Sequence, residues 1–195
     1  MPKPFTTKDQ YFYLAKAKNL RARSAFKLEE IQKKFSLIKN GAIIADLGAA
    51  PGSWSQLLSQ WIGQKGKIFA IDLQEIEPIA SNVQIFCGDI TDFKFLNKIF
   101  EQKITGAVAD LAPKTTGTPD ADSYHSAELN HAVLDICQKY LHPNGFLITK
   151  IFQGEEFVKV LNRTKKLFKI VKCFKPSACR DRSRETYIIG REFKG

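Results

Sequence analysis

The stretch AIIADLGAAPGSWSQLLSQWI, residues 42–62, contains three structural signals in succession. Residues 42–47 form a short apolar run typical of a buried strand. Residues 48–52 form a turn with two glycines, and residues 53–62 have the apolar spacing of an amphipathic helix. The stretch therefore predicts one strand, turn and helix unit of an α/β fold.

The same alternation continues on the carboxyl-terminal side. Strand candidates occupy residues 67–72, 83–87, 106–110 and 146–151, and helical patterns at 93–100 and 129–140 separate them. Such alternation predicts a mostly parallel sheet with helices on both faces. After a helix at 155–167, strands at 170–174 and 185–189 follow with only a loop between them. We expect these two to form an antiparallel pair at one edge, giving seven strands in all.

Charge is distributed unevenly along the 195 residues, although the formal net charge is +10. Residues 1–40 carry +7, residues 41–149 carry −5 and residues 150–195 carry +8. All seven arginines lie in the two end segments. Basic ends on an acidic body favour a phosphate-bearing partner. The chain has no repeat, low-complexity tract or linker, so we expect a single domain over 1–195, with 1–40 as a basic helical extension.

Metal, disulfide and membrane roles find no support in the composition. The four cysteines are widely scattered without a CxxC pair, and the three histidines lack the spacing of a zinc site. No apolar stretch has the length of a signal peptide or of a membrane span. We therefore expect a cytoplasmic protein with no metal and no membrane partner.

Polar residues stand at or just past the end of five strand candidates: Asp46, Asp72, Asp89, Asp110 and Lys150. In open α/β sheets, ligands bind at the edge formed by the carboxyl ends of the strands. Aspartate is also a common turn and capping residue, so one such position would mean little. Five in succession favour a binding site at this edge.

The turn between the first strand and helix allows a ligand to approach the backbone closely. Gly48 and Gly52 lack side chains, but the turn is not GxGxxG, and Pro51 stiffens it. Asp72 stands at the end of the second strand, where a carboxylate can accept hydrogen bonds from both hydroxyls of a ribose. The pattern fits an adenosine-type ligand without a pyrophosphate. Trp54 lies beside the turn, and a tryptophan there more often fills a core than stacks on a ligand.

Both basic ends contain candidate binding residues. A helix from Ser24 places Leu28, Ile31 and Phe35 on one apolar face, with Lys27 at its flank. A surface lysine is the ordinary interpretation of that position, although Lys27 could instead extend along the packed face toward a cleft. The sequence KPSACRDRSR, residues 175–184, has a cluster of arginines that favours phosphate contacts.

Together these motifs resemble the FtsJ/RrmJ (RlmE) family of RNA 2′-O-ribose methyltransferases. The matching segments are RARSAFKLEEI, ADLGAAPGSWSQ, AIDLQ with GDITD, ADLAPKTTGTPD, ITKIFQGEEF, and KP followed by SRETYII. They occur in family order over nearly the whole chain. The resemblance implies a Rossmann-like class I methyltransferase fold with S-adenosyl-L-methionine as cofactor. It also implies cofactor contacts from the glycine turn and the strand ends, namely Gly48, Gly52, Trp54, Asp72, Asp89 and Asp110.

The resemblance further implies a catalytic tetrad of Lys27, Asp110, Lys150 and Glu185. A ribose 2′-hydroxyl is a weak nucleophile, so the reaction needs in-line positioning and a route for the hydroxyl proton. Our hypothesis is that Lys150 takes or steers this proton and Asp110 orients Lys150 and the methyl donor. Lys27 and Glu185 would then fix the nucleotide and the lysine. Like charges and burial lower the pKa of a lysine while carboxylates raise it, so the protonation state of Lys150 stays open at this point.

The basic ends then predict RNA contacts. We expect phosphates to be held by Lys16, Lys18, Arg21, Arg23, Lys33, Lys34, Arg180, Arg182 and Arg184. FQGEEF and SRETYII resemble the ribosomal branch of the family, and this resemblance implies a uridine of large-subunit ribosomal RNA as the target, presented within the large subunit; we expect a monomeric enzyme. Two alternatives stay open: a transfer-RNA or cap ribose methyltransferase, and a non-catalytic RNA-binding module of ribosome assembly.

Overall fold

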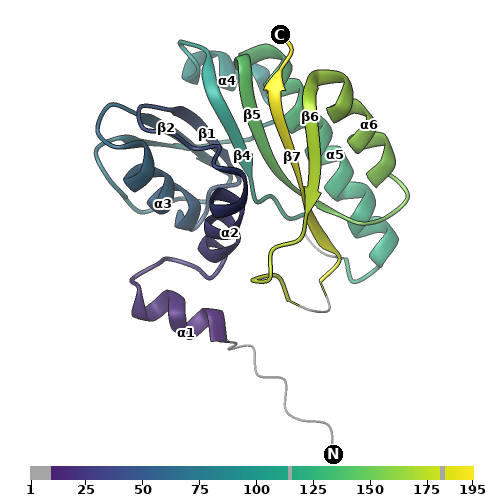
Figure 1. Cartoon of the computed structure of the whole chain (residues 1–195), viewed down its shortest axis with the longest axis horizontal. Coiled ribbons are helices and arrows are strands. Elements are labelled where there is room, and N and C mark those ends of the chain that lie inside the picture. The colour runs from purple at the N-terminus through teal and green to yellow at the C-terminus, as the bar shows by residue number, and fades with distance from the viewer. Residues whose placement is uncertain (1–9, 114–115, 181–182) are drawn as a thin grey trace, which may run out of the picture.

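A computed structural model describes residues 10–113, 116–180 and 183–195 of the chain. Helices and strands alternate along most of it (Figure 1). In chain order they are α1 (Gln10–Ala17), α2 (Ala25–Phe35), β1 (Ile43–Leu47), α3 (Ser53–Ile62), β2 (Lys67–Asp72), β3 (Val83–Cys87), α4 (Phe93–Ile99), β4 (Ile104–Ala109), α5 (Pro119–Tyr140), β5 (Leu141–Phe152), α6 (Phe157–Leu167), β6 (Phe168–Phe174) and β7 (Glu185–Phe193).

The strands form one seven-stranded sheet in the order β3-β2-β1-β4-β5-β7-β6. The first five strands pair in parallel, while β7 runs antiparallel to both β5 and β6. The predicted mostly parallel α/β sheet with an antiparallel pair at one edge is therefore confirmed. The last strand inserts between β5 and β6, so β7 is an interior strand and β6 forms the edge.

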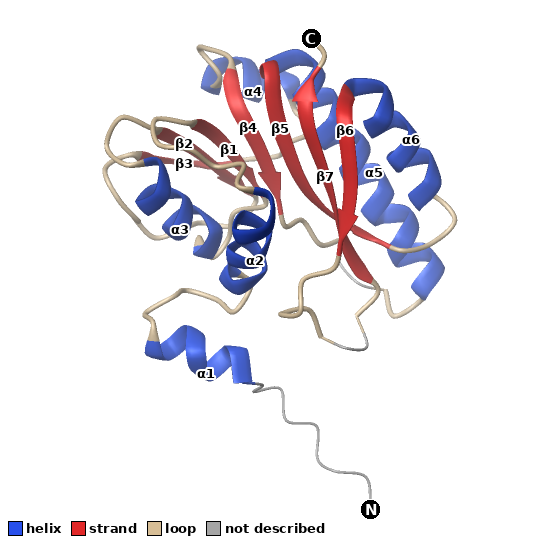
Figure 2. Cartoon of the chain, in the orientation of Figure 1, coloured by secondary structure: helices blue, strands red, loops and turns tan. Residues whose placement is uncertain are grey.

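Helices cover both faces of the sheet, with α2 and α3 on one face and α4, α5 and α6 on the other (Figure 2). Successive strand residues point to opposite faces, and this divides the core into two apolar clusters. In β1, for example, Ile44 packs with α2 and α3 while its neighbour Ala45 packs with α4 and α5. The sheet is thus buried on both sides, as its near-continuous apolar strands require.

Some element boundaries differ from the sequence prediction. The strand, turn and helix unit predicted for residues 42–62 is found as β1 and α3. Strand β5 begins five residues before the predicted start. Its first residue, Leu141, pairs with Ile104 of β4, and the register of the β4–β5 pairing shifts after this point. Helix α5 begins at Pro119, ten residues before the predicted start. The prediction missed its first turns because they carry Asp120 and Asp122 instead of an apolar stripe. Helix α1 lies in the predicted helical extension, where no separate helix was assigned.

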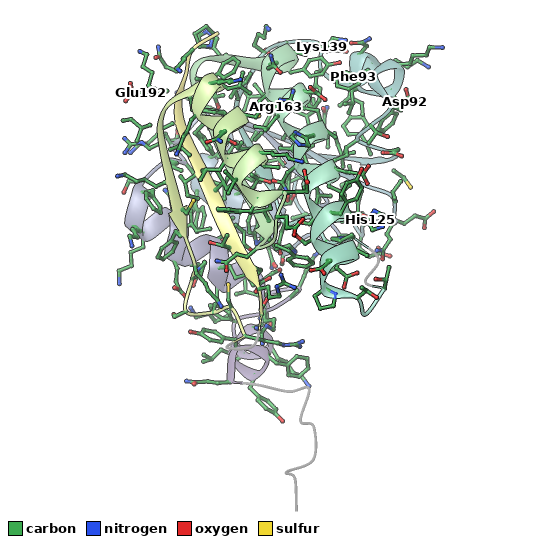
Figure 3. All side chains as sticks on the ribbon, turned by 90° about the vertical axis from the view of Figure 1, so that its right-hand side faces the viewer. Asp92, Phe93, His125, Lys139, Arg163 and Glu192 are labelled. Carbon is green, nitrogen blue, oxygen red and sulfur yellow. The ribbon has the colours of Figure 1, made fainter. Side chains whose placement is uncertain are left out.

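Helices α5 and α6 are tied together on the face seen in Figure 3 by Arg163 of α6. Its guanidinium donates hydrogen bonds to the His131 carbonyl and to Gln138, and it forms an ion pair with Asp135. Within the described ranges, no group of three or more His, Cys, Asp and Glu side chains could hold a metal ion. Among the helices there, none combines the length and apolar character that crossing a membrane demands.

Candidate active site

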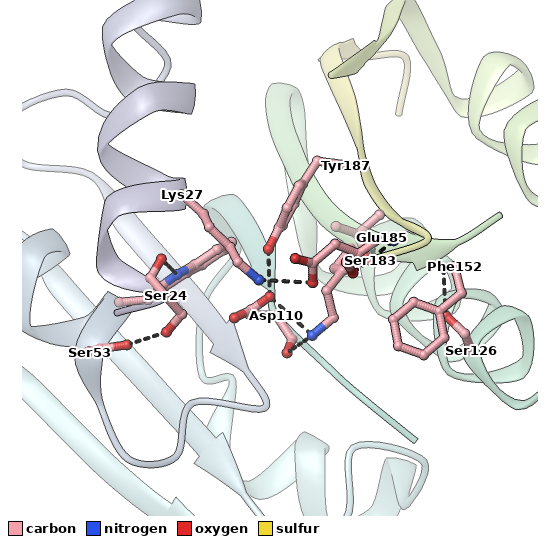
Figure 4. A network of polar contacts seen from close by, with 12 residues as sticks. Ser24, Lys27, Ser53, Asp110, Ser126, Phe152, Ser183, Glu185 and Tyr187 are labelled. Carbon is pink, nitrogen blue, oxygen red and sulfur yellow. Dashed lines mark hydrogen bonds and ion pairs between the residues drawn. The ribbon is translucent and has the colours of Figure 1, made fainter. Parts of the chain in front are cut away.

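The four residues of the proposed tetrad come from separate parts of the chain and meet in one cluster. Figure 4 shows three of them, Lys27, Asp110 and Glu185, side by side. Lys27 lies on α2, Asp110 directly follows β4, Lys150 lies on β5 and Glu185 begins β7. Three of them are buried, with exposed fractions of 7% for Lys27, 6% for Lys150 and 8% for Glu185. The ordinary interpretation of Lys27 as a surface lysine is therefore wrong. Its position at the flank of the apolar stripe carries its amine along the packed face to Glu185.

Two ion pairs organise these charges. Lys27 Nζ lies 2.8 Å from Glu185 Oε2, and Lys150 Nζ lies 3.2 Å from Asp110 Oδ1. Lys150 Nζ also donates a hydrogen bond of 2.8 Å to the Asp110 carbonyl oxygen. Two positive and two negative side chains thus balance each other in a largely buried cluster, as buried charges require.

The pairing of β5 with β7 explains why Lys150 and Glu185 share one face. Phe152 is the register partner of Glu185, and Lys150 is the register partner of Tyr187. Side chains of directly opposed residues lie on the same face, and residues two apart on a strand do as well. Lys150, Glu185 and Tyr187 therefore all point toward the face covered by α2, where Lys27 lies.

Tyr187 is a member of this cluster that the sequence did not single out. Its hydroxyl donates a hydrogen bond of 2.7 Å to Asp110 Oδ1, and its ring packs 5.9 Å from that of Trp54. Burial raises the pKa of Tyr187 well above its ordinary value, and the negative charge of Asp110 acts in the same direction. The phenol therefore stays protonated and keeps donating to Asp110. The sequence could have indicated Tyr187, because residues two apart on a strand point to the same face and Tyr187 lies two residues after Glu185.

Asp110 consequently receives contacts from two sides, the ammonium of Lys150 and the phenol of Tyr187. This fixes its carboxylate at the end of β4. The backbone of Lys150 is anchored separately, because the Asn130 side-chain amide on α5 donates a 2.9 Å hydrogen bond to the Lys150 carbonyl. The side-chain oxygen of Asn130, Oδ1, in turn accepts a hydrogen bond from the Thr149 hydroxyl. The site is thus held from both faces of the sheet.

Glu185 is kept ionised by its neighbours. Burial alone would raise the pKa of the Glu185 carboxyl, but the charge and hydrogen bond of Lys27 outweigh burial and hold the pKa below its ordinary value. The nearby Cys179 thiol acts in the same direction on the pKa of Glu185. Burial, followed by the charge of Glu185, raises the pKa of Cys179 to about 12, so Cys179 stays a neutral thiol.

The strand ends beside this cluster form an acidic edge. Asp72 is half-buried at the end of β2, and its two oxygens accept backbone hydrogen bonds from Ala50 and Gln74. Asp89 is exposed just after β3, and its Oδ1 accepts from the amide of Thr91. Among the described residues, Asp89 Oδ2 has no hydrogen-bond partner. Neighbouring carboxylates with free lone pairs can accept hydrogen bonds from hydroxyl and amino groups of a ligand.

The glycine turn is shaped by packing within the protein. Gly48 has a φ of +74°, and a Cβ there would lie 2.5 Å from the Leu111 side chain. Gly52 has a φ of +101°, and a Cβ there would lie 2.8 Å from Ile79. Both positions therefore need glycine for conformation and for space. They let the turn fold tightly between the start of α3 and the segment that follows β4.

Two buried residues, Asp46 and Trp54, lie on either side of this turn in the sequence. Trp54 is only 2% exposed, and its indole N–H donates a 2.9 Å hydrogen bond to the Ser24 carbonyl. Trp54 on α3 thus packs between the start of α2 and Tyr187 of β7. Asp46 on β1 accepts a 2.6 Å hydrogen bond from Ser55 through Oδ2, while its buried Oδ1 has no partner among the residues that the structure describes. Burial raises the pKa of Asp46 to about 7, against the opposing effect of the Ser55 hydrogen bond.

The arginines of the predicted RNA-binding set differ in their surroundings. The Arg21 guanidinium donates hydrogen bonds to the carbonyls of Pro51, Glu77 and Pro78, so it joins the glycine turn to the segment after β2. These contacts give Arg21 a structural role, and its expected phosphate contact stays a prediction. Arg23 donates to the Ala178 carbonyl.

The other residues of that set lie mainly at the surface. Arg184 donates to the Gln153 carbonyl. Burial, followed by the positive charge of Arg180, lowers the pKa of Arg23, which indicates that the two guanidinium groups lie near each other. Arg182 lies outside the described residues. The exposed members of the set are Lys16, Lys18, Lys33, Lys34, Arg180 and Arg184.

Comparison with known proteins agrees with this architecture. A ribosomal RNA methyltransferase from Plasmodium falciparum superposes with a TM-score of 0.78 and 28% identity, covering 90% of this chain and 99% of that one. Fibrillarin from Aeropyrum pernix, solved with bound S-adenosyl-L-methionine, shares the fold with a TM-score of 0.65 at 19% identity, covering 86% of this chain and 76% of that one.

Sequence comparison gives the assignment. The chain is 39% identical over 196 aligned positions to ribosomal RNA large subunit methyltransferase E of Methanosphaera stadtmanae, covering 96% of this chain and 94% of that protein. The profile of the FtsJ-like methyltransferases matches residues 20–193, a span that starts before α2 and includes every strand and all four residues of the charged cluster. The chain therefore belongs to the FtsJ-like methyltransferase family.

Proposed function

We propose that this protein transfers a methyl group from S-adenosyl-L-methionine to a ribose 2′-hydroxyl of RNA. The observation that carries the proposal is the buried cluster of Lys27, Asp110, Lys150 and Glu185 at the carboxyl edge of the sheet. It lies where ligands bind in open α/β sheets, and it combines two lysines with two carboxylates around one point. An arrangement of this kind can orient a hydroxyl and accept or relay its proton.

The acidic edge fits the cofactor. Asp72 and Asp89 follow adjacent strands, and carboxylates there can hold the ribose hydroxyls and the amino groups of an adenosine and amino-acid ligand. Gly48 and Gly52 would line the turn beside it, with Trp54 supporting that turn from below. The cofactor would supply an electrophilic methyl group on a positively charged sulfur, which an acidic site favours electrostatically. No arginine occurs in residues 41–149, so the edge is poorly suited to a pyrophosphate.

Each side chain of the cluster has a distinct task. Lys150 takes or steers the proton of the 2′-hydroxyl: the Asp110 carboxylate and carbonyl fix the position of its amine, and taking the proton requires the neutral amine, which the positive charges of Lys27 and of the bound cofactor favour. Asp110, fixed by Tyr187, orients Lys150 and one side of the methyl donor. The Lys27–Glu185 pair positions the target nucleotide and keeps the negative charge of Glu185 near Lys150. Positioning of the hydroxyl in line with the methyl group provides much of the rate.

The substrate we propose is large-subunit ribosomal RNA, methylated at a uridine within the particle, by a monomeric cytoplasmic enzyme. The name and the 39% identity of the Methanosphaera relative support the ribosomal choice. Phosphates would be held by exposed basic residues that flank the cluster, among them Lys33, Lys34, Arg180 and Arg184. Affinity for RNA should therefore fall steeply as salt rises. Transfer RNA and capped RNA are the competing substrates.

The proposal is tested by incubating the protein with labelled cofactor and, in separate reactions, large ribosomal subunits, transfer RNA and capped RNA. A 2′-O-methyl group removes the hydroxyl that alkali uses to cleave the chain. We therefore expect label in alkali-resistant dinucleotides derived from large-subunit RNA. Label in free bases or in alkali-sensitive nucleotides would contradict ribose methylation. Label only in transfer or capped RNA would correct the substrate, and RNA binding without turnover would favour the assembly-module alternative.

A further inference from the structure

An aromatic and basic face of α1 stands outside the active site. Phe12, Tyr13 and Leu14 are exposed by 39%, 59% and 39%, and they are consecutive in a helix of eight residues. Lys16 lies four residues after Phe12 and three after Tyr13, so these three side chains share one side of the helix. We name Phe12, Tyr13 and Lys16 the α1 ledge.

The helix is fixed to the protein by its opposite side. The ring of Tyr11 packs 5.4 Å from Phe26, and Ala15 is buried with Phe26 and Ala178 in a small apolar cluster. The Tyr11 hydroxyl lies 3.3 Å from Ser177 Oγ, in the loop that leads toward Glu185. Helix α1 is thus held in place against α2 and that loop, and the ledge faces outward.

The loop beneath α1 is itself clamped. The Glu30 carboxylate of α2 accepts hydrogen bonds from the amides of Ser177 and Ala178 and from the Ser177 hydroxyl, at 2.7, 2.9 and 2.8 Å. Arg180 follows two residues later and is exposed. Helix α2 therefore contacts both the loop beneath α1, through Glu30, and Glu185 of the charged cluster, through Lys27.

The charges around the ledge favour an anionic occupant. Of the acidic residues on α2, Glu30 is bound to the loop and Glu29 lies 3.8 Å from Lys18. Lys16 and Arg180 stay exposed. An aromatic ring beside a lysine offers a stacking surface for a base and a positive charge for the phosphate next to it. A purely apolar protein partner would not use Lys16 or Arg180.

We propose that the α1 ledge is an RNA-docking surface on which an unpaired base of the substrate stacks against Tyr13 while Lys16 contacts an adjacent phosphate. This inference rests on the proposed function, since it takes the substrate to be RNA. It adds a contact outside the cleft, through aromatic side chains that the count of basic residues does not reveal. The ledge would give the protein a second point, outside the cleft, at which to hold the strand.

The test measures binding of the full-length protein to a fluorescent single-stranded RNA of about 16 nucleotides, a length suited to single-strand sites. Tyr13→Ala should bind at least about 5-fold more weakly, and Tyr13→Phe, which keeps the ring, should restore affinity. Lys16→Gln should reduce the slope of log affinity against log salt by about one. The matched control is Tyr124→Ala, because Tyr124 on α5 is 52% exposed beside the acidic Glu155 and Glu156 and should not affect binding.

A second measurement separates stacking from general apolar contact. Tyr13→Leu keeps apolar area without a π-face, so it should bind as weakly as Tyr13→Ala. In Tyr13→Trp, RNA should quench the added indole emission, measured against the wild-type protein. Wild-type affinity in Tyr13→Ala or Tyr13→Leu would overturn the ledge while leaving the active-site proposal intact. Weakened binding by these variants, in a protein that transfers no methyl to ribose, would support the ledge and contradict the proposed function.

Discussion

Lys27 of α2 and Glu185 of β7 are 158 residues apart in the chain and form a buried ion pair with 2.8 Å between Nζ and Oε2. The pair joins the basic amino-terminal segment to the last strand of the sheet. It also brings the two basic ends of the sequence to one side of the acidic body.

Breaking the Lys27–Glu185 pair on one side should destabilise the protein more than removing both partners. Lys27→Met leaves the Glu185 carboxylate buried without its counter-ion, and we expect a loss of roughly 3 kcal/mol in the free energy of unfolding. The double variant Lys27→Met/Glu185→Leu should recover a large part of that loss. Urea denaturation of both single variants and the double variant measures the coupling, with Lys159→Met at the exposed Glu156 pair as control. Strictly additive losses would show that the two residues do not interact.

Replacing Lys150 should slow the chemical step without preventing cofactor binding. Lys150→Ala removes the group that takes or steers the proton, so the single-turnover rate at saturating cofactor should fall by at least about 100-fold. Lys150→Arg keeps the positive charge beside Asp110 and should also be slow, which distinguishes proton handling from charge balance. The control is Lys159→Ala on the surface of α6, expected to keep the wild-type rate. A wild-type single-turnover rate in Lys150→Ala would remove Lys150 from the mechanism.

Stability should decrease with rising pH because of Asp46. Burial raises the pKa of this carboxyl from 3.8 to about 7, so between these values the folded protein holds a proton that the unfolded chain has released. Unfolding is then increasingly favoured as pH rises, by on the order of 4 kcal/mol in total, and the change levels off above pH 7. Asp46→Asn should lack this component, whereas the exposed Asp120→Asn should retain it.

The measurement for Asp46 is the free energy of unfolding in urea from pH 4 to pH 8. The difference between wild type and Asp46→Asn should change between about pH 4 and pH 7 and stay constant from pH 7 to pH 8. Other carboxyls act in the opposite direction, since the lowered pKa of Glu185 gives stability that is lost as pH falls. Comparing the two proteins cancels such shared contributions. Parallel curves would mean that Asp46 titrates normally in the folded protein.

Removing Glu30 should release the 177–180 loop without changing the acidic edge formed by Asp72 and Asp89. In Glu30→Ala the amides of Ser177 and Ala178 lose their acceptor, so their hydrogen exchange should accelerate and stability should fall by roughly 2 kcal/mol. The Michaelis constant for RNA should rise several-fold, because Arg180 is no longer held in place, and the cofactor dissociation constant should stay unchanged. Glu29→Gln is the neighbouring control. Unchanged exchange at residues 177 and 178 would argue against the clamp.

Much of the fold could be predicted from the sequence because it depends on local patterns. The run at 43–47, the turn at 48–52 and the helix at 53–62 are each recognisable within a short window, and β2 and β3 were located to the residue. Prediction failed where the pattern was weak. The polar first turns of α5 and the start of β5 before Phe146 carry no apolar periodicity, and their structure depends on pairing and packing with distant elements.

The candidate site divides in the same way. The strand-end aspartates follow from topology, and the resemblance pointed to Lys27, Lys150 and Glu185. Tyr187 was missed because an apolar strand makes a tyrosine look like core. The backbone contacts of Arg21 were also missed, because an arginine in a basic segment looks like a phosphate ligand and the sequence does not show that it donates to three backbone carbonyls. In both cases the partners lie far away in the sequence.

The sequence by itself determined the order of strands and helices and the separation of charge into basic ends and an acidic body, because apolar periodicity and residue type are local properties. Only the tertiary structure decided which charges meet. The burial of Lys27 against Glu185, the use of Arg21 as a backbone clamp and the outward face of α1 result from packing between elements that are far apart in the chain. The desolvation and ion pairing that make the cluster chemically useful arise only once those elements are packed together.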